Sequence, residues 1–221
     1  FNVYTKTLLA FLGVYGSARD VLDATEWQLQ QALEVQRGRK SEEITVQHIK
    51  DLAQTSIGVS YRAAMVRDSA KAVLACQQRD EELTKALVEL EKTLHRRQME
   101  ILVSIPGIGE VTASHFLSEI PDISQFATYQ KLIAFAGTDP GIYESGNSSK
   151  QLRISKHGNP VLRKYLYLMA DSCVKHNIVF NTYYHKKRDA GFPHRKAMVA
   201  TMNKLVRTLH ALLSKDEMYS L

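Results

Sequence analysis

The chain has 221 residues, of which 44% are hydrophobic, and a formal net charge of +6. This is enough apolar material for one sizeable core or two small ones. No apolar run approaches the roughly 18–20 residues of a membrane span, and the amino terminus lacks the basic start and cleavage site of a signal peptide. We therefore expect a cytoplasmic protein. The chain starts without Met, inside an apolar helix-like segment, which indicates a piece of a longer protein.

The positive charge is concentrated in the carboxyl-terminal part of the chain. Between Ser145 and Lys215 there are 14 Lys and Arg residues and two acids, a net charge of +12, so the remaining residues are acidic on balance. Such asymmetry favours a polyanionic partner bound at one end of the protein. Nucleic acid is the partner we expect, and a merely solvated basic face is the alternative.

Residues 1–60 are predicted to form a region of short helices. The segments 4–15, 27–35 and 45–53 are apolar at helical spacing, and glycine follows the second and third of them. Trp27 is the only tryptophan, and we expect it to pack in a core. This region shows no residue pattern typical of catalysis.

Residues 61–103 are predicted to form one long helix, because they contain neither Gly nor Pro. Leu83, Leu87, Leu90 and Leu94 follow the spacing of a coiled-coil seam. Some 40 residues would extend for roughly 60 Å, so the helix needs a second helix or a second chain to pack against. We expect a coiled coil that joins copies of the chain into a homo-oligomer.

Residues 104–120 read as a helix, a turn and a second helix. The turn is Ile105-Pro106-Gly107-Ile108-Gly109, called the glycine turn below. Its glycines permit a tight turn and leave N–H groups free at the start of the second helix, where phosphate can bind. The segment resembles the helix-hairpin-helix motif, which holds the DNA backbone. A helix corner whose glycines serve close packing is an equally good interpretation.

Residues 137–158 are predicted to be a loop that contains Ser145 and Gly146. The stretch 142–150 is polar and rich in hydroxyl groups, and we expect it to lack regular structure. A serine beside a glycine and near Lys and Arg side chains could attack a phosphodiester, although most Ser-Gly pairs are ordinary loop residues. Tyr183 and Tyr184 are rival nucleophiles by the same reasoning, but at most one of them could serve, and packing is the better interpretation of both.

Residues 159–215 are predicted to form basic helices. Asn159 and Pro160 fit the N-cap and first position of a helix, 181–195 is predicted to be a basic loop, and 196–213 a final amphipathic helix. The histidines and the two cysteines show no metal-ligand spacing, so we expect two buried thiols and no metal site in this chain. The residues expected to bind DNA are Gly107, Gly109, Lys150, Arg153, Lys156, Arg163 and Lys164.

The order of these motifs carries a resemblance to a known family. Ile-Pro-Gly-Ile-Gly, Ala-Gly-x-Asp-Pro, Ser-Gly, Ile-Ser-Lys-x-Gly-Asn and Leu-Arg-x-x-Leu follow one another between Ile105 and Leu166. Together they resemble the carboxyl-terminal transposase domain of the DEDD-type bacterial insertion-sequence transposases, which include the recombinases guided by a bridge RNA. The resemblance extends over about Ile101 to Leu213, and the helix before it fits the coiled coil of the same proteins.

The resemblance implies a DNA recombinase made of two parts. An amino-terminal RuvC-like domain would bind Mg²⁺ through four acids, and a serine of the carboxyl-terminal domain would become joined to DNA. That serine corresponds to Ser145, with Ser148 and Ser149 as the alternative positions. No acid-rich strand domain is visible in these 221 residues. The chain alone is therefore expected to be inactive, with DNA and a structured guide RNA as partners.

The sequence thus predicts an all-α protein with three regions: short helices at 1–60, a coiled-coil helix at 61–103 and a transposase domain at 104–221. A second hypothesis is a helical DNA-binding and dimerisation module without catalytic activity, in which Ser145 has no special role.

Overall fold

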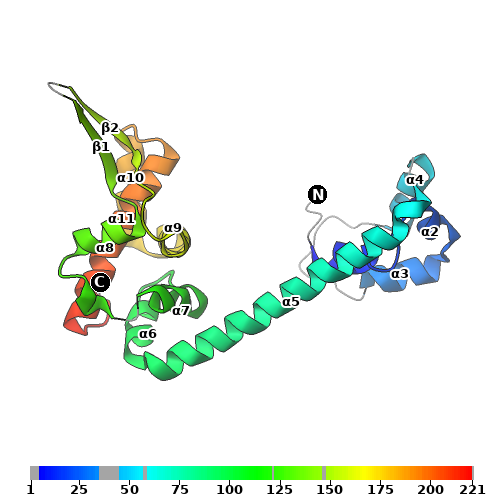
Figure 1. Ribbon diagram of the computed structural model, residues 1–221, viewed down its shortest axis with the longest axis horizontal. Helices are drawn as coiled ribbons and strands as arrows, with labels where there is room; N and C mark the ends of the chain where they lie inside the picture. The colour runs from blue at the N-terminus through cyan, green and yellow to red at the C-terminus, as the bar shows by residue number, and fades with distance from the viewer. Residues whose placement is uncertain (1–4, 35–44, 57–58, 121, 146–147, 221) are drawn as a thin grey trace. The chain divides into compact units, whose positions relative to one another are not determined.

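The computed structural model describes residues 5–34, 45–56, 59–120, 122–145 and 148–220. The expected all-α class is confirmed, because helices form nearly all of the regular structure. The chain divides into two compact units, Phe1–Leu83 and Thr84–Leu221. Figure 1 shows the order of the elements from blue to red.

The first unit contains four short helices around a small core. These are α1 (Lys6–Leu12), α2 (Ala18–Asp23), α3 (Glu26–Glu34) and α4 (Val46–Thr55). Phe11, Val21, Leu29 and Ala53 form the buried cluster. Trp27, which we expected to pack, is 71% exposed, so that expectation is wrong. The stop signals at Gly38 and Gly58 lie outside the described residues.

The predicted helix over 61–103 is interrupted. A short 3₁₀ turn, η1 (Ser60–Arg62), precedes α5 (Ala63–Leu94), and α6 (Arg96–Val103) follows after His95 leaves the helical conformation at φ −126° and ψ 43°. The break allows Met99 and Leu102 of α6 to enter the core of the second unit. At 1.5 Å per residue the 32 residues of α5 extend for about 48 Å.

The second unit is built around α9 (Pro160–His176). α7 (Glu110–Glu119), α10 (Ile178–Asp189) and α11 (His194–Lys215) pack on it, and α8 (Tyr129–Ala136) packs on α9 and α11. A 3₁₀ turn, η2 (Ile123–Gln125), lies between α7 and α8. The core includes Phe116, Leu166 and Leu205, each 0% exposed. As predicted, Asn159 caps α9, accepting from the N–H groups of its first turn, and Pro160 takes the first helical position.

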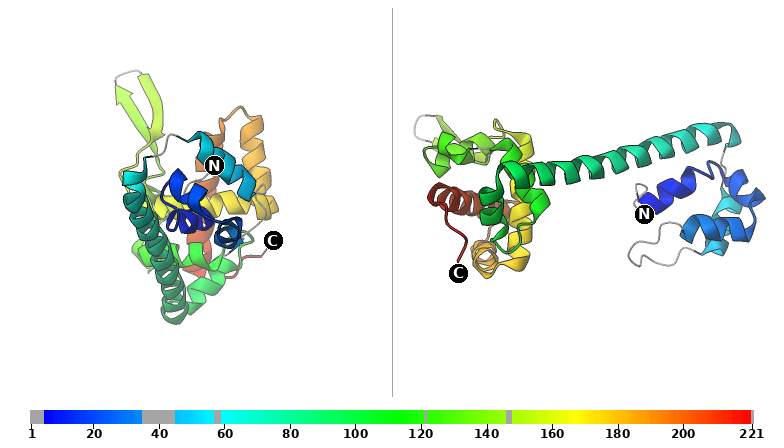
Figure 2. Two further views of the ribbon diagram at one scale, coloured as in Figure 1. Left: turned by 90° about the vertical axis from the view of Figure 1, so that its right-hand side faces the viewer. Right: turned by 90° about the horizontal axis from the view of Figure 1, so that it is seen from below.

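A two-stranded antiparallel sheet replaces the predicted loop around Ser145. β1 (Pro140–Ser145) pairs with β2 (Ser148–Ile154), with an irregularity between Pro140 and Ile142. Figure 2 shows this β-hairpin extending beyond the helices of its own unit. The expectation of an irregular segment at 142–150 was wrong for the residues described, because cross-strand backbone hydrogen bonds order a polar sequence whose side chains give no alternating apolar pattern.

The predicted basic loop over 181–195 is also wrong, because most of it is helix α10. Asn177 accepts from the Val179 N–H at 3.0 Å and caps the helix, while Phe180 anchors it in the core at 1% exposure. The chain leaves the helix only after Asp189, and Gly191 turns it at φ +83°. The many positive charges of α10 therefore lie on a fixed helical surface.

Among the described residues, no helix is both long enough and apolar enough to cross a membrane.

Candidate nucleic-acid interface

The first glycine of the glycine turn packs against α9. Gly107 has φ +104°, and a Cβ atom placed on it would lie 2.8 Å from both the Cα and the N atom of Cys173. Only glycine fits both the backbone angle and the close approach. The close-packing interpretation of the turn therefore holds for Gly107, whatever else the turn does.

The second glycine stands in open space at the start of α7. Gly109 is the N-cap of α7 and makes no side-chain capping bond, and a Cβ atom placed on it would meet no neighbour within 4 Å. The next residue, Glu110, accepts from Lys92 Nζ at 2.9 Å, and this bond raises the pKa of Lys92. A carboxylate in the first turn of a helix repels a phosphate bound at the same helix start. The ion pair with Lys92 offsets this repulsion at Glu110.

The β-hairpin carries Ser145 as the last residue of β1. Ser145 pairs with Ser148 across the strands, and Lys150 pairs with Tyr143 two positions further along. At about 3.4 Å per residue, the backbone of Lys150 lies about 7 Å along the hairpin from this pair, whereas Arg153 lies about 17 Å away. The fold thus brings Lys150 near Ser145 and separates Arg153 from it. Gly146 lies outside the described residues.

Backbone hydrogen bonds close the base of the β-hairpin and join it to the carboxyl end of α8. The N–H of Ser155 donates to Asp139 O at 3.0 Å, that of Lys156 to Gly137 O at 3.2 Å, and that of Asn159 to Phe135 O at 2.7 Å. The Ser155 hydroxyl also donates to Asp139 Oδ1 at 2.5 Å. The Ile-Ser-Lys-x-Gly-Asn motif is therefore the segment that fastens β2 to the helices.

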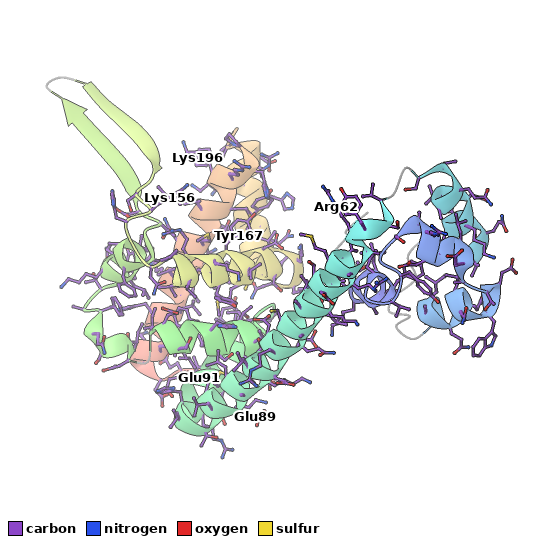
Figure 3. The ribbon with its side chains drawn as sticks, turned by 45° about the vertical axis from the view of Figure 1, so that its right-hand side comes forward. Arg62, Glu89, Glu91, Lys156, Tyr167 and Lys196 are labelled. Carbon is purple, nitrogen blue, oxygen red and sulfur yellow. The ribbon has the colours of Figure 1, made fainter. Side chains whose placement is uncertain are left out.

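Three predicted DNA-binding cations lie in this segment or shortly after it, and they differ in their surroundings. The Arg163 guanidinium is half-buried and donates from Nη1 to Ala136 O at 2.9 Å, at the carboxyl end of α8. Lys156, labelled in Figure 3, and Lys164 are both exposed. In the part of the chain that the structure describes, none of the three forms an ion pair. Lys156 and Lys164 are thus open to an anion, whereas Arg163 also has a structural role.

A cluster of lysines and aromatic rings on α10 and α11 was missed in the sequence. Lys204 Nζ lies 4.7 Å from the centre of the Tyr183 ring, and Lys187 Nζ lies 5.4 Å from it. Lys187 and Lys196 lie 5.4 and 4.4 Å from the Phe192 ring. We call these five residues the lysine-aromatic cluster. Tyr183 and Lys187 are four residues apart, the spacing of neighbours on one face of a helix, so the sequence could have indicated this pair. The contact of Lys204 with Tyr183 joins two helices, so residue spacing does not indicate it.

The rival tyrosines have other neighbours. The Tyr183 ring contacts Lys187 and Lys204 of the lysine-aromatic cluster, while the Tyr184 hydroxyl is 2.8 Å from His194 Nδ1.

The two cysteines differ in exposure. Cys173 is buried, as expected, and burial raises its pKa to about 12, whereas Cys76 is exposed, contrary to expectation. Among the described residues, no group of three or more His, Cys, Asp or Glu could hold a metal ion.

Comparison with known proteins finds similarity to mobile-element proteins. Residues 99–185 match the model of the transposase family IS116/IS110/IS902. The chain is 31% identical over 172 residues to the uncharacterized 42 kDa protein of insertion element IS900 from Mycobacterium paratuberculosis, covering 76% of the chain and 42% of that protein. It is 33% identical over 142 residues to the transposase of insertion sequence IS1111A from Coxiella burnetii, covering 63% and 38%.

A third relative is a pilin gene-inverting protein from Moraxella bovis, 30% identical over 118 residues, which cover 52% of the chain and 37% of the relative. The chain thus spans about two fifths of the length of these relatives. The matched region begins within α6 and ends within α10, so it includes the glycine turn, the β-hairpin and its fastening. Over residues 99–185, less than half of its length, the chain is similar to the IS116/IS110/IS902 transposase family.

Proposed function

We propose that this chain is the DNA-binding and strand-joining part of an insertion-sequence transposase, with Ser145 as its nucleophile. The observation that carries the proposal is the family match over residues 99–185, which contains Ser145. Two of the similar proteins are a transposase and a pilin gene-inverting protein, and both names describe DNA rearrangement. The choice of Ser145 itself rests on the resemblance of the Ser-Gly motif.

The proposed reaction is an exchange of phosphodiester bonds. The Oγ of Ser145 forms a bond to a DNA phosphorus, and the bond from that phosphorus to one sugar oxygen breaks. The serine proton leaves Oγ, and the departing sugar oxygen is protonated as a hydroxyl group. Attack by the new strand end reverses these changes and releases the serine. Lys150, whose backbone lies two positions along the β-hairpin from the pair of Ser145 and Ser148, is proposed to offset charge on the phosphate.

A Mg²⁺ ion belongs to this proposal only through the resemblance, which places it in an acidic domain. The described residues do not fit such an ion, since they contain no suitable cluster of acids. We therefore assign it no step in this chain. The corresponding expectation is that residues 1–221 bind DNA but are inert in cleavage without the further part that the longer relatives contain.

Binding of DNA, and of a structured guide RNA, is proposed to depend on phosphate contacts. The segment from Ser145 to Lys215 supplies 14 cationic side chains against two acids. Lys156 and Lys164 are exposed and without ion pairs in the described chain, which suits them for phosphate contacts. Such contacts carry little sequence information, so we expect weak sequence preference and strong dependence on salt.

The test is the capture of a covalent protein–DNA adduct with a full-length protein that contains these residues. Wild-type protein should yield an adduct whose peptide map places the DNA on Ser145. Ser145→Ala should abolish the adduct, while Ser148→Ala and Tyr183→Phe should retain it. An adduct on Tyr183, or undiminished adduct in Ser145→Ala, would refute the assignment of the nucleophile.

The second candidate function, a binding and dimerisation module, is favoured by the exposed seam of α5. Leu83, Leu90 and Leu94 are 54%, 52% and 62% exposed. Three exposed leucines at coiled-coil spacing favour a second helix as their partner, and we propose a second copy of the chain. On the module hypothesis, Ser145→Ala leaves DNA binding and dimerisation intact. The recombination activity of a full-length protein with this substitution should then equal that of the wild type.

A further inference from the structure

The lysine-aromatic cluster borders a shallow depression between α10 and α11. The depression has a volume of about 380 Å³ and is lined by Ile178, Val179, Thr182, Tyr183, Lys186 and Lys204. Ile178 is 65% exposed and Val179 is 38% exposed, so apolar surface stays in contact with water here. The site therefore combines an apolar floor with positive charge at its border.

The cations of this surface lack acidic partners. Residues 178–215 contain eight Lys and Arg and one acid, Asp189. Within the described chain, Lys187, Lys196 and Lys204 form no ion pair. Burial lowers the pKa of Lys204, whose Nζ has one weak hydrogen bond at 3.4 Å, to Val179 O. An anion beside Lys204 would compensate this loss of hydration.

The geometry orders the lysines along the helices. Lys196 and Lys204 lie eight residues apart on α11, about 12 Å along its axis and near the same face. Lys187 on α10 reaches the rings of both Tyr183 and Phe192. The ring contacts connect the three lysines in the order Lys204, Lys187 and Lys196, through Tyr183 and Phe192, and we call these lysines the lysine row. Lys204 also lines the depression.

We propose that this surface binds an unpaired DNA strand, with phosphates along the lysine row and a base over the apolar depression. Duplex DNA presents phosphates but hides the faces of its bases, and it would leave Ile178 and Val179 without a partner. Unpaired bases have exposed π-faces, and proteins that bind single strands combine a cationic track with apolar and aromatic contacts. The inference rests on the proposed function, because strand exchange exposes such segments.

The test is fluorescence anisotropy of the 221-residue chain with a labelled oligothymidine of about twelve nucleotides, at salt concentrations between about 50 and 200 mM. The variant Lys187→Gln/Lys204→Gln should reduce the log–log salt slope by about 1.4, since each phosphate contact on a single strand contributes about 0.7. The matched control Lys85→Gln/Lys131→Gln removes the same charge from exposed positions elsewhere in the second unit, outside the basic segment, and should leave the slope unchanged.

A second variant tests the base contact separately. Ile178→Ser should weaken binding of the oligothymidine about fivefold or more while leaving the salt slope unchanged, because it removes apolar surface and no charge. Leu52→Ser, at an exposed position of α4 in the first unit, is its control and should have no effect. Circular dichroism melting confirms that all four variants fold.

Duplex DNA and single-stranded RNA of equal length complete the experiment. Equal effects of the lysine variant and its control would overturn the proposal. So would an equal loss of duplex binding, which would indicate a plain phosphate patch, or a preference for RNA over DNA. Failure of Ser145 to form an adduct would refute the proposed nucleophile but would leave these binding results unchanged, so the two failures can be distinguished.

Discussion

Substitution of the two glycines of the glycine turn should have very different effects on stability. In Gly107→Ala, the backbone must keep φ +104°, which costs a residue with a side chain about 1–3 kcal/mol. The new methyl group would also lie 2.8 Å from the backbone of Cys173 in the last turn of α9, and relief of such overpacking costs about 1–3 kcal/mol more. A total near 3 kcal/mol is a conservative expectation.

In Gly109→Ala, the methyl group meets no atom within 4 Å and φ is −98°. Only the weaker capping ability of alanine remains, worth about 0.5 kcal/mol. For a unit of this size about 3 kcal/mol corresponds to a fall of about 10 °C in melting temperature. Circular dichroism melting should therefore show this fall for Gly107→Ala and a change of about 2 °C for Gly109→Ala.

The two glycine variants also separate the effect of close packing from the effect of DNA binding. Because Gly109→Ala keeps the fold, any loss of duplex affinity in this variant reports on the helix start of α7 as a phosphate site. Equal melting temperatures for the two alanine variants would refute the packing argument for Gly107.

Three further predictions concern stability, reactivity and association. Arg163→Ala should lower the free energy of unfolding by about 1–2 kcal/mol in urea titrations, because the guanidinium no longer donates to the last carbonyl of α8. Lys164→Ala should leave this free energy unchanged, and equal free energies of unfolding for the two variants would contradict the role of Arg163. Burial raises the pKa of Cys173 from 9.0 to about 12, so its thiol stays neutral at pH 9, and iodoacetamide should modify exposed Cys76 only, as mass spectrometry can check. Leu90→Asp should reduce association in sedimentation velocity without lowering the melting temperature, since Leu90 is 52% exposed; a variant that associates like the wild type would exclude the seam as the interface.

Local chemistry made parts of the fold predictable from the sequence. Asn159 followed by Pro160 indicates the start of α9 because an amide side chain satisfies free N–H groups and proline needs none. The end of α8 at Gly137 was likewise visible, and the glycine there adopts the left-handed conformation at φ +68°. Both signals act within a few residues along the chain.

What could not be predicted depends on partners distant in the sequence. The β-hairpin is stabilised by pairing between two polar segments, so neither strand shows an apolar alternation. The helix α10 was hidden by its charges, since Phe180 is its one buried residue and a single buried position gives no periodic pattern. At the candidate site, the contact of Lys204 with Tyr183 joins α11 to α10 and exists only after the helices pack.

The fastening of β2 to α8 sets how accurately Ser145 can be positioned. The six residues of β1 extend for about 20 Å from the fastened end to Ser145. A tilt of only about 10° at that end would move Ser145 by about 3.5 Å, and an error of about 1 Å at a reacting atom can reduce a rate about a hundredfold. The position of Ser145 would thus depend on hydrogen bonds accepted by Asp139, Gly137 and Phe135, far from the reacting atom. Under the proposed mechanism, substitutions that loosen those bonds should reduce strand joining even though they lie far from Ser145.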